Sequence, residues 1–205
     1  MKAKDIIDGL LSSELQGNAV AELEEPARNQ KLLRWINQAI RDINLRLPLI
    51  QREKVYNLGT DSVGGNSMTY VTPADYQGIL SAFDEKGRPI AINDESDKLS
   101  IFTPEPFRIF IPYSVEGAKV SIIYQATVPE IDNVDSQLPV GDQYENAISY
   151  YVVMKALAGM GTKDAPANTS YEAKYEKAIS LLVSSGMYNK DSLQEVTHFE
   201  RGGWR

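Results

Sequence analysis

The spacing of apolar residues changes twice along this chain of 205 residues, and this change limits its fold more than any other feature. Near the start, apolar positions recur at the spacing that places them on one face of an α-helix. They predict helices over residues 3–16 and 26–47, the second with Pro26 in its first turn and a stop before Pro48. The polar residues predicted on the opposite face of the second helix are Arg34, Asn37, Gln38, Arg41 and Asp42.

The same helical spacing returns after residue 140. Two pairs of residues have the separation of a capping box and so predict helix starts: Asp142 with Glu145, and Thr169 with Glu172. The apolar and aromatic positions that follow predict helices over residues 142–160 and 169–186. The chain therefore carries a helical pair at each end of a non-helical middle.

Between residues 50 and 128, short runs rich in β-branched and aromatic residues alternate with turn residues. The predicted strands are Arg52–Leu58, Ser67–Val71, Gly78–Phe83, Pro89–Ile92, Leu99–Phe102, Arg108–Ile111 and Lys119–Gln125. Segments 84–87 and 114–117 end in glycine and are predicted to connect hairpins, and segment 59–66 is predicted to be a mobile loop. We expect an antiparallel sheet or a small barrel.

The order of helices, strands and helices favours one helical domain interrupted by an insertion, because the two helical pairs can bury their apolar faces against each other. The predicted fold class is α+β: a four-helix bundle with an inserted antiparallel β-rich domain and an extended C-terminal tail. The predicted boundaries are 1–49 and 129–186 for the discontinuous bundle domain, 50–128 for the β-rich domain and 187–205 for the tail.

Composition argues against several classes of function. The net charge of −7 and a pI near 4.9 give no basic surface for tight nucleic-acid binding, although a local basic patch would escape this argument. Without cysteine the side chains form no disulfide, thiolate nucleophile or cysteine metal site, which fits a reducing cytoplasm. The sequence shows no signal-peptide pattern and no apolar run of the roughly 20 residues that a membrane span requires, so no membrane partner is expected.

Catalytic and metal-binding patterns are also missing from the sequence. The single histidine, His198, lies in the tail, where the structural signals are weak. Asp132, Asp135 and Asp142 lack the spacing and the glycine of a calcium loop and are interpreted as loop residues. Segment 159–163 follows a helix rather than a strand, so it is interpreted as a helix stop and not as a phosphate loop. No metal and no cofactor are predicted.

Acidic pairs leave one enzymatic alternative open. Glu24 with Glu25, or Asp94 with Glu95, could supply the two carboxylates of a glycoside hydrolase. With 28 acidic residues such pairs arise by chance, and surface charge explains them better. We therefore predict a structural protein without enzyme activity or catalytic residues.

Aromatic residues are frequent in the predicted helices. The group consists of Trp35, Tyr144, Tyr150, Tyr151, Tyr171 and Tyr175. Packing between helices is the favoured interpretation, because aromatic side chains dominate the energetics of burial. Facing a partner protein is the alternative for some of these tyrosines, because rigid aromatic surfaces are favoured at interfaces.

Three motifs in the helical blocks together resemble a known family. They are Leu33-Arg34-Trp35-Ile36-Asn37-Gln38-Ala39-Ile40-Arg41-Asp42-Ile43, Leu138-Pro139 ahead of Tyr144-Glu145-Asn146-Ala147-Ile148-Ser149-Tyr150-Tyr151, and Ala173-Lys174-Tyr175. These motifs resemble the head-to-tail adaptor (connector) proteins of tailed bacteriophages, including the tail tubular protein A type of short-tailed phages. The β block matches that family only in its position, and the motifs describe helix packing rather than catalysis.

The resemblance implies a structural protein of the virion, made in the host bacterial cytoplasm and located at the head-tail interface. Its subunits would form a homo-oligomeric ring, usually a dodecamer, between the portal protein and the tail nozzle protein. Genomic DNA would pass through the lumen without sequence-specific binding, and the acidic balance is compatible because negative potential does not hold phosphate. The alternative is a cell-wall glycan hydrolase associated with the phage tail, because some adaptors of this class are credited with cell-wall hydrolysis.

The C-terminal tail, residues 187–205, carries the predicted docking residues. The helical period fails after Gly186, so we expect the tail to be poorly ordered in the isolated subunit. It nevertheless contains aromatic and arginine side chains of the kind that interfaces rely on. The predicted portal-docking residues are Phe199, Arg201, Trp204 and Arg205. We expect these anchors to order the tail against the portal.

Overall fold

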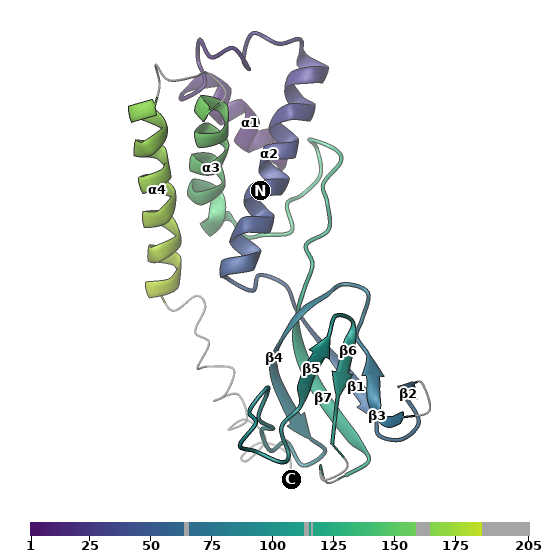
Figure 1. The fold of residues 1–205 in the computed structure, drawn as a ribbon. Helices are drawn as coiled ribbons and strands as arrows, with labels where there is room; N and C mark the ends of the chain where they lie inside the picture. The colour runs from purple at the N-terminus through teal and green to yellow at the C-terminus, as the bar shows by residue number, and fades with distance from the viewer. Residues whose placement is uncertain (64–65, 113–114, 116, 159–164, 186–205) are drawn as a thin grey trace, which may run out of the picture. The chain divides into compact units, whose positions relative to one another are not determined.

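A computed structural model describes residues 1–63, 66–112, 115, 117–158 and 165–185. Within these residues the chain forms four α-helices and seven β-strands (Figure 1). They divide into two compact units: residues 1–49 with 128–185 hold the helices, and residues 50–127 hold the strands. The combination of helices with antiparallel sheets agrees with the predicted α+β class.

Helix α1 spans Ala3–Ser12 and helix α2 spans Glu25–Arg46. α1 ends earlier than the predicted residue 16. The hydroxyl groups of Ser12 and Ser13 both donate to the carbonyl oxygen of Gly9, at 2.9 and 2.7 Å, and so compete with the helical hydrogen bonds. α2 has a proline in its first turn and ends close to the predicted boundary.

A 3₁₀ turn, Asp142–Tyr144, leads into α3 (Glu145–Ala158), and α4 spans Ala165–Ser184. Neither predicted capping box sets a helix start. Asp142 lies inside the 3₁₀ turn, whose N-cap is Gly141 without a side-chain hydrogen bond. Thr169 lies inside α4, because a proline in the first turn allows the helix to begin earlier, at Ala165. No helix in the described ranges is long and apolar enough to cross a membrane.

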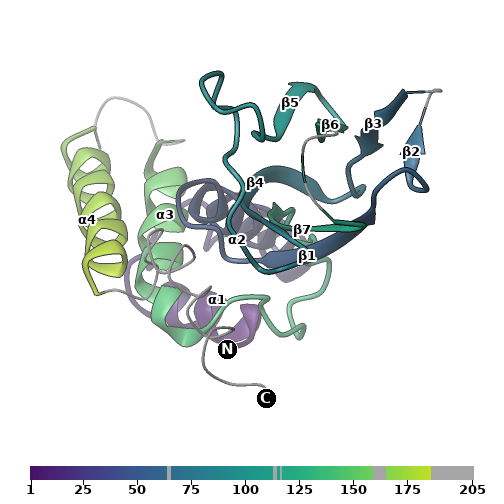
Figure 2. The same ribbon diagram turned by 90° about the horizontal axis from the view of Figure 1, so that it is seen from below.

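The apolar faces of the helices share one core. α3 contacts α2 and α4, and α1 contacts α2 and α3. α4 runs beside α3 in both views of the chain (Figures 1 and 2). The centre of this core consists of fully buried aliphatic side chains: Leu32, Ile36, Ile40, Ile43, Ile148 and Val152. Burying each of them contributes about 1.5–3 kcal/mol, so this core is the main stabilising feature of the helical unit.

One residue predicted on the polar face of α2 is buried. Asn37 is only 7% exposed, and its side-chain amide hydrogen-bonds both backbone groups of Ile131. Its Nδ2 donates to the Ile131 carbonyl at 2.7 Å, and its Oδ1 accepts from the Ile131 N–H at 3.0 Å. Asn37 therefore fixes the segment that leads from the strands to α3 onto the side of α2.

A polar cluster near the end of α2 connects this helix to α4. Arg46 Nη1 lies 2.7 and 2.8 Å from the two carboxylate oxygens of Glu176, and its Nε lies 2.9 Å from Asp42 Oδ2. The Tyr175 hydroxyl donates to the same Asp42 oxygen at 2.5 Å. Burial, with the adjacent Asp42 carboxylate, raises the pKa of Tyr175 well above its usual value, so the hydroxyl stays protonated and donates.

The strand unit contains two antiparallel sheets. The strands are β1 (Gln51–Asn57), β2 (Ser62–Val63), β3 (Asn66–Val71), β4 (Tyr76–Asp84), β5 (Phe102–Glu105), β6 (Arg108–Phe110) and β7 (Lys119–Ala126). One sheet has the order β1-β7-β4 and the other the order β2-β3-β6-β5. Alternate residues of β7 are buried, and Val120 and Ile122 pack in one core with Tyr70 and Ile109 of the second sheet.

The predicted strands differ from the observed ones in three places. Segment 89–92 forms single bridges instead of a strand, because a proline cannot donate to a ladder. The predicted strand 99–102 starts only at Phe102, after a turn in which the Asp97 carboxylate accepts the Leu99 N–H at 2.8 Å. The predicted mobile loop 59–66 contains the short strand β2.

The two predicted hairpin connections have different outcomes. Segment 84–87 is a tight turn, in which the Asp84 carboxylate accepts the backbone N–H groups of Lys86 and Arg88 and the Arg88 guanidinium. Burial alone would raise the pKa of Asp84, but these hydrogen bonds lower it below its usual value. The strands on either side of segment 114–117, β6 and β7, belong to different sheets and so do not form the predicted hairpin. Residues 114 and 116 of that segment lie outside the described residues.

Candidate functional site

The predicted docking residues cannot be placed in the fold. Phe199, Arg201, Trp204 and Arg205 lie outside the described residues, as does His198. The same is true of the predicted helix stop at 159–163 and of the whole predicted tail. These assignments stay predictions.

The three aspartates considered as a cation site lie on the segment between β7 and α3. Asp132, Asp135 and Asp142 are all exposed, and no three acidic or histidine side chains in the described ranges gather closely enough to hold a metal ion. Asp132 lines a hollow of about 520 Å³ with Pro26 and Leu33 of the helical unit. The other side chains lining this hollow are uncharged, so it offers a single carboxylate and no acid-base pair.

The acidic pairs considered for glycoside hydrolysis are exposed. Glu24 and Glu25 lie at the start of α2, where the helix dipole favours negative charge. Asp94 accepts hydrogen bonds from the hydroxyl and the N–H of Ser96 at 2.6 and 2.9 Å, and these bonds lower the pKa of Asp94. The general acid of a glycosidase needs a raised pKa, so Asp94 shows the opposite of the required feature.

The aromatic residues of the helices mainly pack inside the helical unit. Tyr144 and Tyr175 are buried, and the remaining four pack against the same core as partly buried side chains: Trp35, Tyr150, Tyr151 and Tyr171. The rings of Tyr151 and Tyr175 meet edge to face, with their centroids 5.4 Å apart. The interpretation of this group as packing residues is confirmed.

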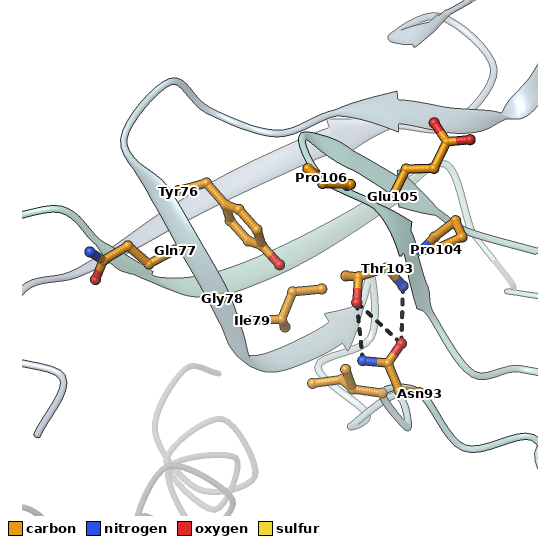
Figure 3. A pocket seen from close by; sticks show the side chains of 10 residues that line it. Tyr76, Gln77, Gly78, Ile79, Asn93, Thr103, Pro104, Glu105 and Pro106 are labelled. Atoms are coloured by element: carbon orange, nitrogen blue, oxygen red, sulfur yellow. Dashed lines mark hydrogen bonds between the residues drawn. The ribbon is translucent and has the colours of Figure 1, made fainter. Parts of the chain in front are cut away.

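A groove of about 490 Å³ lies in the strand unit between β4 and β5 (Figure 3). Segments 76–79 and 103–106 form its two walls, and Ile92 and Asn93 complete the lining. The Asn93 amide is fixed by Thr103: Oδ1 accepts the Thr103 N–H at 3.0 Å, and Nδ2 donates to its hydroxyl at 3.1 Å (Figure 3). The lining contains one carboxylate, that of Glu105, so the groove offers recognition surface rather than acid-base chemistry.

The turn between β5 and β6 presents a phenylalanine to solvent. Glu105 and Arg108 are register partners, so Pro106 and Phe107 form a connection of two residues. The φ angle of Phe107 is +66°, in the left-handed region. A proline followed by a left-handed residue is typical of a type II turn, which normally takes glycine at the second position. A bulky L-residue there costs about 1–2 kcal/mol of backbone strain.

Backbone and charge contacts hold this turn in place. The Phe107 carbonyl oxygen accepts the Thr72 N–H at 3.0 Å, and Arg108 Nη1 lies 3.4 Å from Glu105 Oε2. The Phe107 side chain is 65% exposed. None of these restraints involves the phenyl ring, so the ring is displayed by the turn rather than used to build it.

In the part of the chain that the structure describes, exposed recognition surfaces occur on rigid elements, and reactive side chains do not converge. Exposed surfaces of this kind can serve recognition. The chain belongs to the SU10 adaptor protein family, whose family model matches residues 1–196. It is therefore a bacteriophage structural adaptor and a component of the virion. A comparison with curated proteins gave no match.

This match confirms the resemblance to phage adaptors that the helical motifs carry. The match also covers the strand unit, which resembles the family in the sequence analysis only by its position in the chain. Sequence reasoning missed the groove and the Phe107 turn. The sequence Pro104-Glu105-Pro106-Phe107 contains a signal for the turn. A proline cannot donate a hydrogen bond to a neighbouring strand, so two prolines separated by one residue favour the end of a strand and a turn. The positive φ of Phe107 had no signal, since no glycine or asparagine marks it.

Proposed function

We propose that this adaptor forms a homo-oligomeric ring, a dodecamer, that joins the portal protein to the tail nozzle protein at the head-tail interface. The observation that supports this proposal is the family match over residues 1–196, because an adaptor works by contacting other components of the virion. The ring would form part of the channel through which DNA leaves the head.

In this proposal the two compact units act as domains with different tasks. The four helices form a bundle domain of residues 1–49 and 129–186, and residues 50–128 form the inserted β-rich domain. The tail, residues 187–205, docks on the portal through its aromatic and arginine residues. The proposed docking residues are Phe199, Arg201, Trp204 and Arg205.

The net charge of −7 suits a channel subunit, because negative potential at the lumen does not retain passing phosphate groups. DNA therefore passes without sequence-specific binding. The role requires no cofactor, no metal and no membrane contact. The glycan hydrolase alternative has no observation in its favour among the described residues, since the carboxylate pairs considered for it are exposed.

Removal of the tail tests the proposal. We expect deletion of residues 191–205, or the pair Phe199→Ala and Trp204→Ala, to abolish co-sedimentation with purified portal rings while circular dichroism shows intact helices. Lys177→Ala, a change at an exposed position of α4, serves as the matched control and should bind like the wild type. Undiminished portal binding by the truncated protein would show that the tail is only a spacer. A wild-type chain that native mass spectrometry finds monomeric with the portal would contradict the ring.

A further inference from the structure

We infer that the outward face of α2 binds the outward face of α1 in a second copy of this chain. The first face is a basic row on α2, made of Lys31, Arg34, Gln38, Arg41 and Leu45. The second face is an acidic row on α1, made of Asp5, Asp8 and Ser12. The inference rests on the proposed function and deepens it, because it names the two surfaces through which neighbouring subunits of the ring meet.

The basic row follows one line along α2. Its members alternate between three and four residues apart from position 31 to position 45, which is the spacing of a helix face that packs against another helix. The row lies opposite the buried side of α2, which contains Ile36 and Ile43. Its three cations are exposed, and Leu45 is 70% exposed. The row therefore offers a partner both positive charge and an apolar contact.

The charge of α2 is opposite to that of the whole chain. The helix carries five basic side chains and two acidic ones, whereas the chain has a net charge of −7. Arg41 is partly neutralised by Glu130, at 2.9 Å. Lys31 lies over the Trp35 ring, 5.2 Å from its centroid. Among the described residues neither Lys31 nor Arg34 has a carboxylate partner, so both can pair with an acidic surface on another chain.

α1 presents the complementary charge. Residues 1–24 carry five acidic side chains and two basic ones. The acidic row is exposed and lies opposite the buried side of α1, which contains Ile6 and Leu10. Because α1 and α2 bury their inner sides in the same core, their outer rows face away from each other. The two rows of one chain therefore cannot pair with each other.

The spacing of the charges also matches. Asp5 and Asp8 are three residues apart on α1, as Lys31 and Arg34 are on α2. Three residues correspond to about 4.5 Å along a helix axis. Two ion pairs can therefore form together whether the helices meet in parallel or antiparallel orientation.

A second copy of this chain is the partner that these two rows fit. Two different surfaces on opposite sides of a subunit pair head to tail and build a ring when the rotation closes, whereas one self-complementary patch stops at a dimer. Opposite charges also direct the copies to the correct faces and disfavour contact between like faces. Nucleic acid fits less well, because the row presents three cations over about 21 Å on an acidic chain.

The test reverses the charge of each row in the full-length chain. The basic-row variant carries Lys31→Glu and Arg34→Glu, and the acidic-row variant carries Asp5→Lys and Asp8→Lys. The combined variant carries all four changes and restores opposite charges wherever the two rows meet. Lys177→Glu, a reversal at an exposed position of α4, is the matched control.

Thermal melts followed by circular dichroism show whether each variant is folded. Asp5 also accepts the Lys2 N–H at 2.9 Å, so its replacement can destabilise the start of α1. If the acidic-row variant melts early, Asp8→Lys alone takes its place, both by itself and in the combined variant.

The measurement is native mass spectrometry with purified portal rings of the same phage, which counts the adaptor chains bound to each portal as their concentration rises. Each single-row variant should need at least about 10-fold more protein than the wild type to complete the ring, because like charges then face each other. The combined variant should assemble at the wild-type concentration again, and so should the control.

Each outcome decides between explanations. Either single-row variant assembling at the wild-type concentration overturns the inference and leaves the proposed function standing. A wild-type chain that stays monomeric with the portal overturns the proposed function and the inference with it. Weakened single-row variants that the combined variant does not restore show that the rows do not meet, which overturns the inference. A basic-row variant that assembles normally but loses affinity for duplex DNA in a gel-shift assay identifies nucleic acid as the partner and also overturns it.

Discussion

Replacement of Asn37 by alanine should destabilise the helical unit strongly. The Asn37 amide satisfies both backbone groups of Ile131, at 2.7 and 3.0 Å. Asn37 and Ile131 are each only 7% exposed, so water does not readily replace the lost side chain. The alanine variant leaves a buried N–H and a buried C=O without their partner.

The magnitude follows from the two groups left behind. A buried backbone group that loses its hydrogen bond costs about 1–3 kcal/mol, so two groups cost about 2–6 kcal/mol. Domains are stable by only about 5–15 kcal/mol, so this loss is a large share of the total. The melting temperature of a chain of this length should fall by at least about 4 °C.

Urea unfolding followed by far-ultraviolet circular dichroism measures this loss on the helices. Asn146→Ala is the matched control, because Asn146 is an exposed asparagine on α3, and its change should stay within about 0.5 kcal/mol. A loss below about 1 kcal/mol for Asn37→Ala would refute the reasoning. It would mean that water or a backbone shift satisfies Ile131.

Asn37→Asp provides a pH-dependent version of the same test. The carboxylate keeps the shape of the amide but turns an oxygen toward the Ile131 carbonyl that accepted a hydrogen bond. Burial and this carbonyl should raise the folded-state pKa of the new carboxyl above its unfolded value of about 3.9. The variant should therefore regain stability, relative to Asn37→Ala, as the pH falls through the folded pKa. A pH-independent difference between the two variants contradicts this mechanism.

Two further predictions concern charged groups. Arg46→Met removes the ion pair with Glu176 of α4. In urea titrations it should lower the free energy of unfolding by about 1 kcal/mol at low salt, and by less at high salt. Equal losses at low and high salt would contradict an electrostatic origin. The folded pKa of Asp84 lies below 3.8, so its hydrogen bonds add stability above that value, which is lost as the pH falls through the folded pKa. Asp84→Asn should reduce this acid-dependent loss in thermal melts between about pH 5 and 2; an unchanged acid profile would assign the loss to other carboxyls.

The types of the long elements could be predicted from sequence, because each has a period that only one secondary structure satisfies. The stripe of α2, with Leu32, Ile36 and Ile43, is incompatible with a strand, and the alternation along β7 is incompatible with a helix. The helix starts were less predictable. Capping residues identify a start only where no proline or earlier turn offers a competing one, as Thr169 inside α4 shows.

Pairing partners and buried polar residues could not be predicted from local patterns. The connection from β6 to β7 resembles a hairpin in sequence, yet it joins two sheets because the strands share a core from opposite sides. Asn37 belongs to the polar face of α2 by its spacing, and its burial depends on Ile131, 94 positions away. The Phe107 turn could not be predicted for a similar reason. Its conformation depends on the hydrogen bond from Thr72 and on the register of β5 with β6.

The first and last strands of the strand unit are neighbours, and this has an evolutionary consequence. β1 pairs with β7 from Gln51 opposite Gln125, and the Ala126 N–H bonds the Ile50 carbonyl at 2.8 Å. The chain thus leaves the helices and returns to them at two points roughly 5 Å apart, one strand spacing. A tight turn can close a gap of that size. The strand unit is therefore inserted between the helices in the way that a surface loop would be. Related chains can therefore enlarge, exchange or lose this module while the ends of α2 and α3 stay where they are, and an engineer can graft a foreign domain at the same two points.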